Sequence, residues 1–120
     1  MRVAGFGFRE AVSAVALKEA YLRAGGGAEA LAALAGKAEA PAFTDFAAGV
    51  GLPIVAVAPE AVAGIATPTY SARIMERFGT GSVAEAVALV AAGPGARLNG
   101  PRKKSEDGTA TAAIAERNDQ

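Results

Sequence analysis

The 120-residue chain contains no cysteine, no histidine and no tryptophan. Without cysteine, disulfides, thiolate catalysis and cysteine-ligated metals are excluded. Without histidine, the most common general base and the most common transition-metal ligand are missing, so we expect neither a metal site nor a bound cofactor. Twelve Lys and Arg residues balance twelve Asp and Glu residues. The chain therefore has no overall field that would favour nucleic acid or an acidic membrane.

Long hydrophobic runs are also missing. No apolar run approaches the roughly 20 residues that a membrane helix needs, and Arg9 and Glu10 interrupt the N-terminal stretch before a signal-peptide pattern can form. We therefore expect a soluble, cytoplasmic protein. Its 52% hydrophobic content suffices for a core, although alanine supplies much of it. The length predicts one domain over residues 1–115 and a frayed tail over residues 116–120.

The first 25 residues read as a strand, a turn and a helix. A strand begins over residues 2–5, Gly5 and Gly7 indicate a tight turn over residues 5–9, and Ser13 is a plausible cap for a helix over residues 14–24. This order places backbone N–H groups at the carboxyl end of a strand, where open α/β sheets bind their ligands.

The middle of the chain contains one conflict between local and global signals. Residues 28–36 are rich in helix formers, but an α/β pattern needs a second strand here, so we predict a strand over residues 31–34. A helix follows from Pro41 to Gly51. Residues 52–58 are uniformly apolar, as is typical of a strand covered on both faces.

The C-terminal half is predicted to contain short helices, one helix with a clear N-terminal capping signal, and a hairpin. One helical turn covers residues 59–62, a loop covers residues 66–71, and a short helix turns Ile74, Met75 and Phe78 inward. Ser82 and Glu85 predict a capping box for the next helix. Strands over residues 96–99 and 109–115 then form a hairpin, whose long polar turn contains Arg102, Lys103 and Lys104. The alternation of strands and helices predicts an α/β domain.

Several residues are candidates for ligand contacts, and each has a purely structural alternative. The pair Gly5-x-Gly7 lacks the third glycine of a dinucleotide fingerprint, because position 10 is Glu, and the chain contains no P-loop motif. Arg9 suits a carboxylate or phosphate, or is simply solvated. The hydroxyls of residues 67–71 and the glycines and serine of residues 79–82 contact a ligand or only cap helices. The basic run at residues 102–104 attracts a polyanion or is a solvated turn. No pair of carboxylates is placed for acid–base work, so we assign no catalytic residue.

Taken together, these residues resemble the family of CobE and the C-terminal domain of CbiG, which are cobalamin (vitamin B12) biosynthesis proteins. The resemblance rests on an ordered set of motifs over residues 2–115. They are VAGFGFR at residues 3–9, Lys37, GLP at residues 51–53, TPTYS at residues 67–71, GTGSVAEA at residues 79–86, and KKS at residues 103–105. Glu10 departs from the family, which often has a second basic residue there.

The resemblance implies a three-layer α/β/α fold with a mixed, mostly parallel sheet and a C-terminal β-hairpin. It implies that the chain binds or handles a polycarboxylated precorrin or other corrinoid intermediate, with no nucleic-acid or membrane partner. The residues that match the family's motifs and would hold such a ligand are Gly5, Gly7, Arg9, Lys37, Thr67, Thr69, Ser71, Gly81, Ser82, Lys103 and Lys104. Two alternatives stay open. One is a CbiG-like hydrolase of a precorrin lactone, using a water oriented by Glu85 or Thr69, and the other is a module that docks onto another pathway enzyme.

Overall fold

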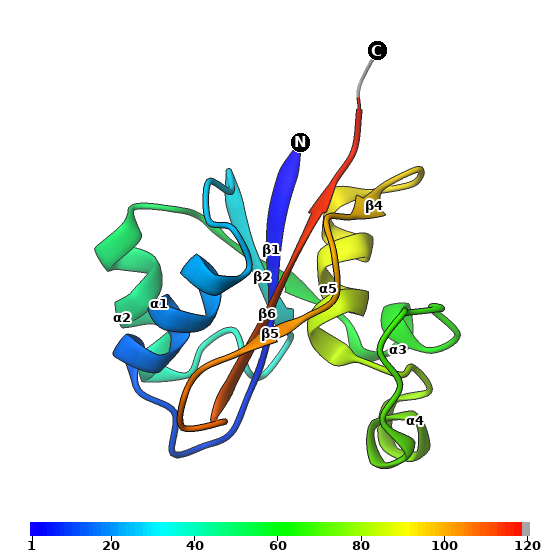
Figure 1. Cartoon of the computed structure of the whole chain (residues 1–120), viewed down its shortest axis with the longest axis horizontal. Helices are drawn as coiled ribbons and strands as arrows, with labels where there is room; N and C mark the ends of the chain where they lie inside the picture. The colour runs from blue at the N-terminus through cyan, green and yellow to red at the C-terminus, as the bar shows by residue number, and fades with distance from the viewer. Residues whose placement is uncertain (119–120) are drawn as a thin grey trace.

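A mixed sheet of six strands lies between two layers of helices in the computed structural model, which describes residues 1–118 (Figure 1). The strands are β1 (Arg2–Phe8), β2 (Ala30–Leu34), β3 (Ile54–Val57), β4 (Arg97–Leu98), β5 (Lys103–Lys104) and β6 (Ala110–Glu116). The helices are α1 (Ala14–Arg23), α2 (Pro41–Val50), α3 (Pro59–Val62), α4 (Ala72–Phe78) and α5 (Val83–Ala92). Helices α1 and α2 cover one face of the sheet, and α5 covers the other.

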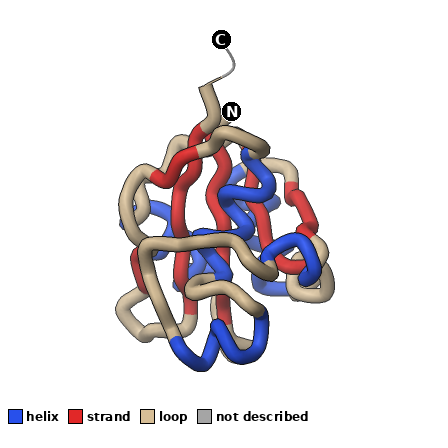
Figure 2. Tube along the Cα trace, turned by 90° about the vertical axis from the view of Figure 1, so that its right-hand side faces the viewer, coloured by secondary structure: helices blue, strands red, loops and turns tan. Residues whose placement is uncertain are grey.

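The topology confirms the predicted fold class, a three-layer α/β fold with a mixed sheet and a C-terminal strand pair. The strand order is β3-β2-β1-β6-β4, and β5 also pairs with β6. Strands β1, β2 and β3 are parallel, whereas β6 runs antiparallel to β1, β4 and β5. Figure 2 shows the long strands side by side, with the start of β1 and the end of β6 at the same end of the molecule.

The predicted glycine turn over residues 5–9 is wrong, because β1 continues through it to Phe8 and pairs with β6 along its whole length. Neither Gly5 nor Gly7 has a positive φ. Gly5 is instead required by packing, since a Cβ atom there would lie 2.3 Å from the Ala84 carbonyl oxygen and 2.5 Å from the Ala88 nitrogen. The missing side chain lets α5 lie directly against the sheet.

The predicted strand over residues 31–34 is confirmed as β2, which is buried along its whole length. It pairs with β1 on one side and β3 on the other, so sheet pairing overrides the helix propensity of its alanines and leucines. Strand β3, by contrast, is not covered on both faces as predicted. It is an edge strand that pairs only with β2, and Ala56 is exposed.

The two faces of the sheet carry different cores. Toward α1 and α2 the core is aromatic, and the Phe6 ring lies 5.4 Å from the Phe43 ring and 5.3 Å from the Phe46 ring, both edge-on. Toward α5 it consists mainly of alanine and valine. Helix α4 contributes no fully buried residue. The prediction that Ile74, Met75 and Phe78 turn inward is wrong for Met75, which is exposed, whereas Ile74 is half-buried and Phe78 packs half-buried against the core on the α5 side.

The C-terminal hairpin differs from its prediction in its turn. Lys103 and Lys104 form β5, so two of the three basic residues lie in a strand, and the turn is made by residues 105–109. There the Asp107 carboxylate accepts hydrogen bonds from Ser105 Oγ, Thr109 Oγ1 and the Thr109 N–H.

Strand β6 extends to Glu116, and the Arg117 N–H donates to the Met1 carbonyl oxygen, so pairing reaches into the tail predicted over residues 116–120. The last two residues of that prediction lie outside the described residues. Within residues 1–118, no helix is long and apolar enough to cross a membrane.

Candidate functional site

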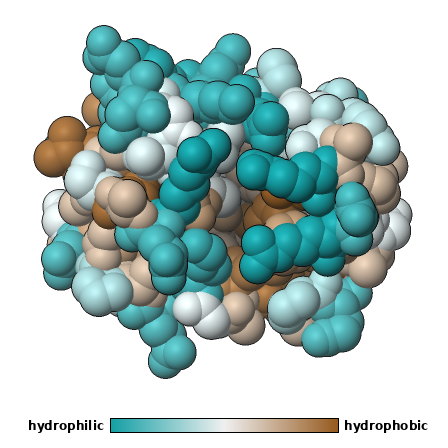
Figure 3. Space-filling model, turned by 90° about the horizontal axis from the view of Figure 1, so that it is seen from below, coloured by the Kyte–Doolittle hydropathy of each residue, from teal (hydrophilic) through white to brown (hydrophobic). Residues whose placement is uncertain are grey.

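The carboxyl ends of β1, β2 and β3 lie together, because these strands are parallel neighbours. We call this side of the molecule the carboxyl edge. The start of α5 lies there as well, since Val83 and Ala84 lie 3.8 Å from the Cβ position of Gly7 near the end of β1. Figure 3 views the molecule from this side and shows a hollow with a hydrophobic floor between long hydrophilic side chains. The carboxyl edge is where α/β sheets usually bind ligands.

Lys37 is held at this edge by two contacts with β1. Its Nζ donates a 2.8 Å hydrogen bond to the Phe8 carbonyl oxygen and lies 4.8 Å from the centre of the Phe8 ring. The residue is half-buried, and within residues 1–118 it forms no ion pair with a carboxylate. An ammonium has three donors, so Lys37 keeps donors for an anion.

Arg9 follows β1 directly and brings a second positive charge to the carboxyl edge. Its N–H donates to the Thr109 carbonyl oxygen at 2.9 Å, which fixes the backbone, while the side chain is exposed. Glu10 and Glu39 lie in the same two loops, yet neither pairs with Arg9 or Lys37 within the described residues. The two cations are therefore available to an anionic ligand.

The hydroxyl-bearing loop at residues 67–71 also lies at this edge, but its polar groups bond mainly to neighbouring residues. Thr67 Oγ1 donates to the Thr69 carbonyl oxygen at 2.8 Å, and the Ser71 N–H donates to the Gly81 carbonyl oxygen at 2.9 Å. Ser71 and Ser82 cap α4 and α5. A Cβ on Gly81 would lie 2.5 Å from the Thr69 carbonyl oxygen, so this glycine lets the loop close over the start of α5.

Glu85 joins these elements in a way that sequence reasoning missed. Half of the predicted capping box is present, because the Glu85 N–H donates to Ser82 Oγ at 3.4 Å. The Glu85 carboxylate, however, is fully buried and accepts hydrogen bonds from the Thr69 N–H (3.0 Å), Thr69 Oγ1 (2.7 Å) and the Arg102 N–H (2.8 Å). The motif that indicates a helix cap carries no signal for these distant donors.

The two lysines of β5 lie on opposite faces of the sheet. Lys104 pairs with Thr111 and Lys103 with Ala112, and directly paired residues share a face. Thr111 pairs with Gly7 on the α5 face, whereas Ala112 belongs to the core beneath α1 and α2. Both lysines are exposed. Only Lys104 therefore shares a face with Glu85 and the loop at residues 67–71, although both lysines were predicted as ligand contacts.

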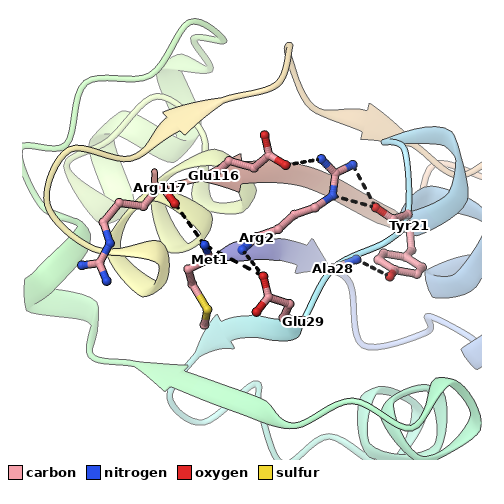
Figure 4. A network of polar contacts seen from close by, with 8 residues as sticks. Met1, Arg2, Tyr21, Ala28, Glu29, Glu116 and Arg117 are labelled. Carbon is pink, nitrogen blue, oxygen red and sulfur yellow. Dashed lines mark hydrogen bonds and ion pairs between the residues drawn. The ribbon is translucent and has the colours of Figure 1, made fainter. Parts of the chain in front are cut away.

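The opposite edge of the sheet carries a different polar network (Figure 4). Arg2 bonds to the Glu116 carboxylate at 2.7 Å and to the Gly26 carbonyl oxygen, and the Met1 ammonium lies 3.9 Å from Glu29. The hydrogen bond from Arg2 is the main cause that lowers the pKa of Glu116. Met1, Arg2, Glu29 and Glu116 line a hollow of about 400 Å³, and none of the predicted site residues lines it. Charges are thus paired at this edge, while Arg9 and Lys37 at the carboxyl edge are not.

The described residues contain no group of three or more acidic side chains that could hold a metal ion.

The chain matches one protein-family model and is similar to solved structures, among them those of two cobalamin biosynthesis proteins. Residues 2–115 match the model of the cobalamin synthesis G C-terminus. The crystal structure of CobE, a protein from the cobalamin (vitamin B12) biosynthetic pathway, is 28% identical with a TM-score of 0.79, over 98% of this chain and 91% of that one. The cobalamin biosynthesis protein chiG from Agrobacterium tumefaciens strain C58 is 32% identical with a TM-score of 0.73, over 99% and 100%. No curated protein matches the chain.

Proposed function

The chain belongs to the family of the cobalamin synthesis G C-terminus, as its motifs predicted, and on this premise we propose that it binds a polycarboxylated corrinoid intermediate at its carboxyl edge. It is a protein of cobalamin biosynthesis. The proposal concerns the ligand and the place where the ligand binds.

The observation that carries the proposal is the environment of the Lys37 side chain. Its ammonium is half-buried against the Phe8 ring and has no carboxylate partner within residues 1–118. Partial burial strengthens a charge-assisted hydrogen bond to an incoming anion, and Arg9 adds a planar donor fork that suits a carboxylate. A corrinoid has carboxylates around an apolar ring, which fits hydrophilic side chains around a hydrophobic floor (Figure 3).

The same geometry supports binding over hydrolysis. Both Glu85 oxygens accept hydrogen bonds inside the protein, and Thr69 Oγ1 is one of the donors. Glu85 is also fully buried, so neither residue is placed to orient an attacking water. Gly5 lies buried beneath α5 and is explained by packing, so we leave it out of the proposed site.

The proposal can be tested by titrating the protein with cobyrinic acid, a corrin whose peripheral side chains end in free carboxylates. The matched control ligand is its methyl ester, which keeps the ring but loses the charges. We expect binding of the acid only. Arg9→Ala and Lys37→Met should each weaken binding about tenfold, since a charge-assisted hydrogen bond contributes about 1.5–3 kcal/mol. Arg97→Ala should have no effect, because Arg97 is an exposed cation that pairs with Glu116 in the register at the opposite edge.

Two results would contradict the proposal. Equal binding of the acid and its ester would show that carboxylates are not recognised. Loss of affinity in Arg97→Ala equal to that in Arg9→Ala would show that only the overall charge matters and that the carboxyl edge is not the site.

A further inference from the structure

Glu85 is the one charged side chain that is buried within residues 1–118. A buried carboxylate must be compensated by hydrogen bonds or by a cation. Here no Lys or Arg side chain pairs with it among the described residues. Its compensation comes from three protein donors and from its position in the first turn of α5, where the helix dipole favours a negative charge.

The three donors come from two segments that are distant in the sequence. Thr69 belongs to the loop at residues 67–71, and Arg102 immediately precedes β5. The Asn99 N–H bonds to the Ile114 carbonyl oxygen, and β5 pairs with β6. Between Asn99 and β5, the hydrogen bond from the Arg102 N–H to the Glu85 carboxylate is the one hydrogen bond that holds the backbone within the described residues. The Glu85 carboxylate therefore connects the loop at residues 67–71 with the residue that immediately precedes β5.

We propose that Glu85 is a positioning residue that sets Lys104 relative to the loop at residues 67–71, so that both act on one ligand. The inference rests on the proposed function. Lys104 lies two residues after Arg102 and on the α5 face, which Glu85 and the loop share. Because the Glu85 carboxylate is buried and both its oxygens accept hydrogen bonds from Arg102 or Thr69, it acts through these residues and does not touch the ligand.

The change Glu85→Met tests this inference with a side chain of similar length. Thr69 Oγ1 and the Arg102 N–H donate to the same carboxylate oxygen, so the amide oxygen of a Gln could still accept from both, whereas a thioether sulfur is only a weak acceptor. We expect faster hydrogen exchange at the Arg102 and Thr69 amides, by about tenfold or more. Ser82→Ala is the matched control, because it removes the cap of the same helix and leaves the bonds of the Glu85 carboxylate intact.

A double-mutant cycle separates positioning from general destabilisation. In the wild type, Lys104→Ala should weaken cobyrinic acid binding about tenfold, whereas in the Glu85→Met background the same change should cost less than about twofold. In the Ser82→Ala background the effect of Lys104→Ala should remain about tenfold. If Lys104→Ala has the same effect in all three backgrounds, Glu85 does not position the lysine and the inference is wrong.

Failure of the inference can be told apart from failure of the proposed function. If the wild type does not bind cobyrinic acid, the proposed function fails, and the positioning of Lys104 for a ligand fails with it. If the wild type binds but the cycle shows no coupling, only the positioning role is lost. Should Glu85→Met fail to fold, Thr69→Val removes one donor to the same carboxylate, and it should reduce the effect of Lys104→Ala in the same direction.

Discussion

The contact between Gly5 and α5 makes a sharp prediction about stability. A Cβ atom at Gly5 would lie 2.3 Å from the Ala84 carbonyl oxygen, 2.5 Å from the Ala88 nitrogen and 2.8 Å from the Ala88 Cβ. Two of these three atoms belong to the backbone of α5, so no side-chain rotation can relieve the overlap. The change Gly5→Ala must therefore push the helix away from the sheet.

The cost can be worked from these distances. Overpacking a well-filled core costs about 1–3 kcal/mol, and backbone atoms at such distances place Gly5→Ala at or above the upper end of that range. The reduced freedom of the unfolded chain returns about 0.4–1 kcal/mol. The net loss should be about 2–3 kcal/mol. For a domain of this size about 1 kcal/mol corresponds to roughly 3–5 °C, so Tm should fall by about 6–15 °C.

Thermal unfolding followed by circular dichroism measures this shift, and Gly7→Ala is its control. Gly7 lies two residues along the same strand and face, but the nearest atoms to its Cβ position lie at 3.7 and 3.8 Å, which is ordinary contact. Gly7→Ala should leave Tm unchanged or raise it slightly. If Gly5→Ala is as stable as the wild type, or if both changes destabilise the protein equally, the close approach of α5 does not explain the glycine.

Two further predictions concern the ends of elements. The carboxyls of Glu116 and Asp107 have lowered pKa values, the first mainly through the hydrogen bond from Arg2 and the second mainly through the Thr109 N–H. A lowered pKa in the folded state contributes stability above the unfolded pKa of about 4, and this stability is lost as the pH falls through the folded value. Tm should therefore drop more steeply below about pH 4 in the wild type than in Glu116→Gln. Ser13→Ala should cost about 1 kcal/mol in urea unfolding, because the Ser13 side chain accepts a hydrogen bond at the start of α1; an unchanged urea midpoint would contradict this.

The sequence was most informative where local signals and the needs of the fold agree. Ser13 and Ser82 cap their helices as predicted, because a cap involves residues only three positions apart. Strand β2 was predicted against its propensity, because an α/β sheet needs a strand between two helices. The family's motifs were recognisable because they are spread in order over nearly the whole chain.

The errors come from residues whose role is decided by distant partners. A glycine permits either a positive φ or close packing, and nothing near Gly5 indicates that α5 will lie on it. The pairing register of a two-residue strand decides the faces of Lys103 and Lys104, and this register is not encoded by the lysines themselves. Glu85 looked like a complete helix cap, whereas its carboxylate bonds to residues 16 and 17 positions away.

The separation of charges gives a neutral chain the means to recognise a polyanion. The net charge is zero, so the protein exerts no long-range pull on a negatively charged ligand. At the edge that bears Arg2 and Glu116, the charges neutralise one another in ion pairs. At the carboxyl edge Lys37 and Arg9 have no such partners among residues 1–118, and their field reaches only about a Debye length, roughly 8–10 Å, into solution. Recognition must then depend on where the ligand's carboxylates lie, so the spacing of these cations should distinguish one corrinoid from another more than total ligand charge does.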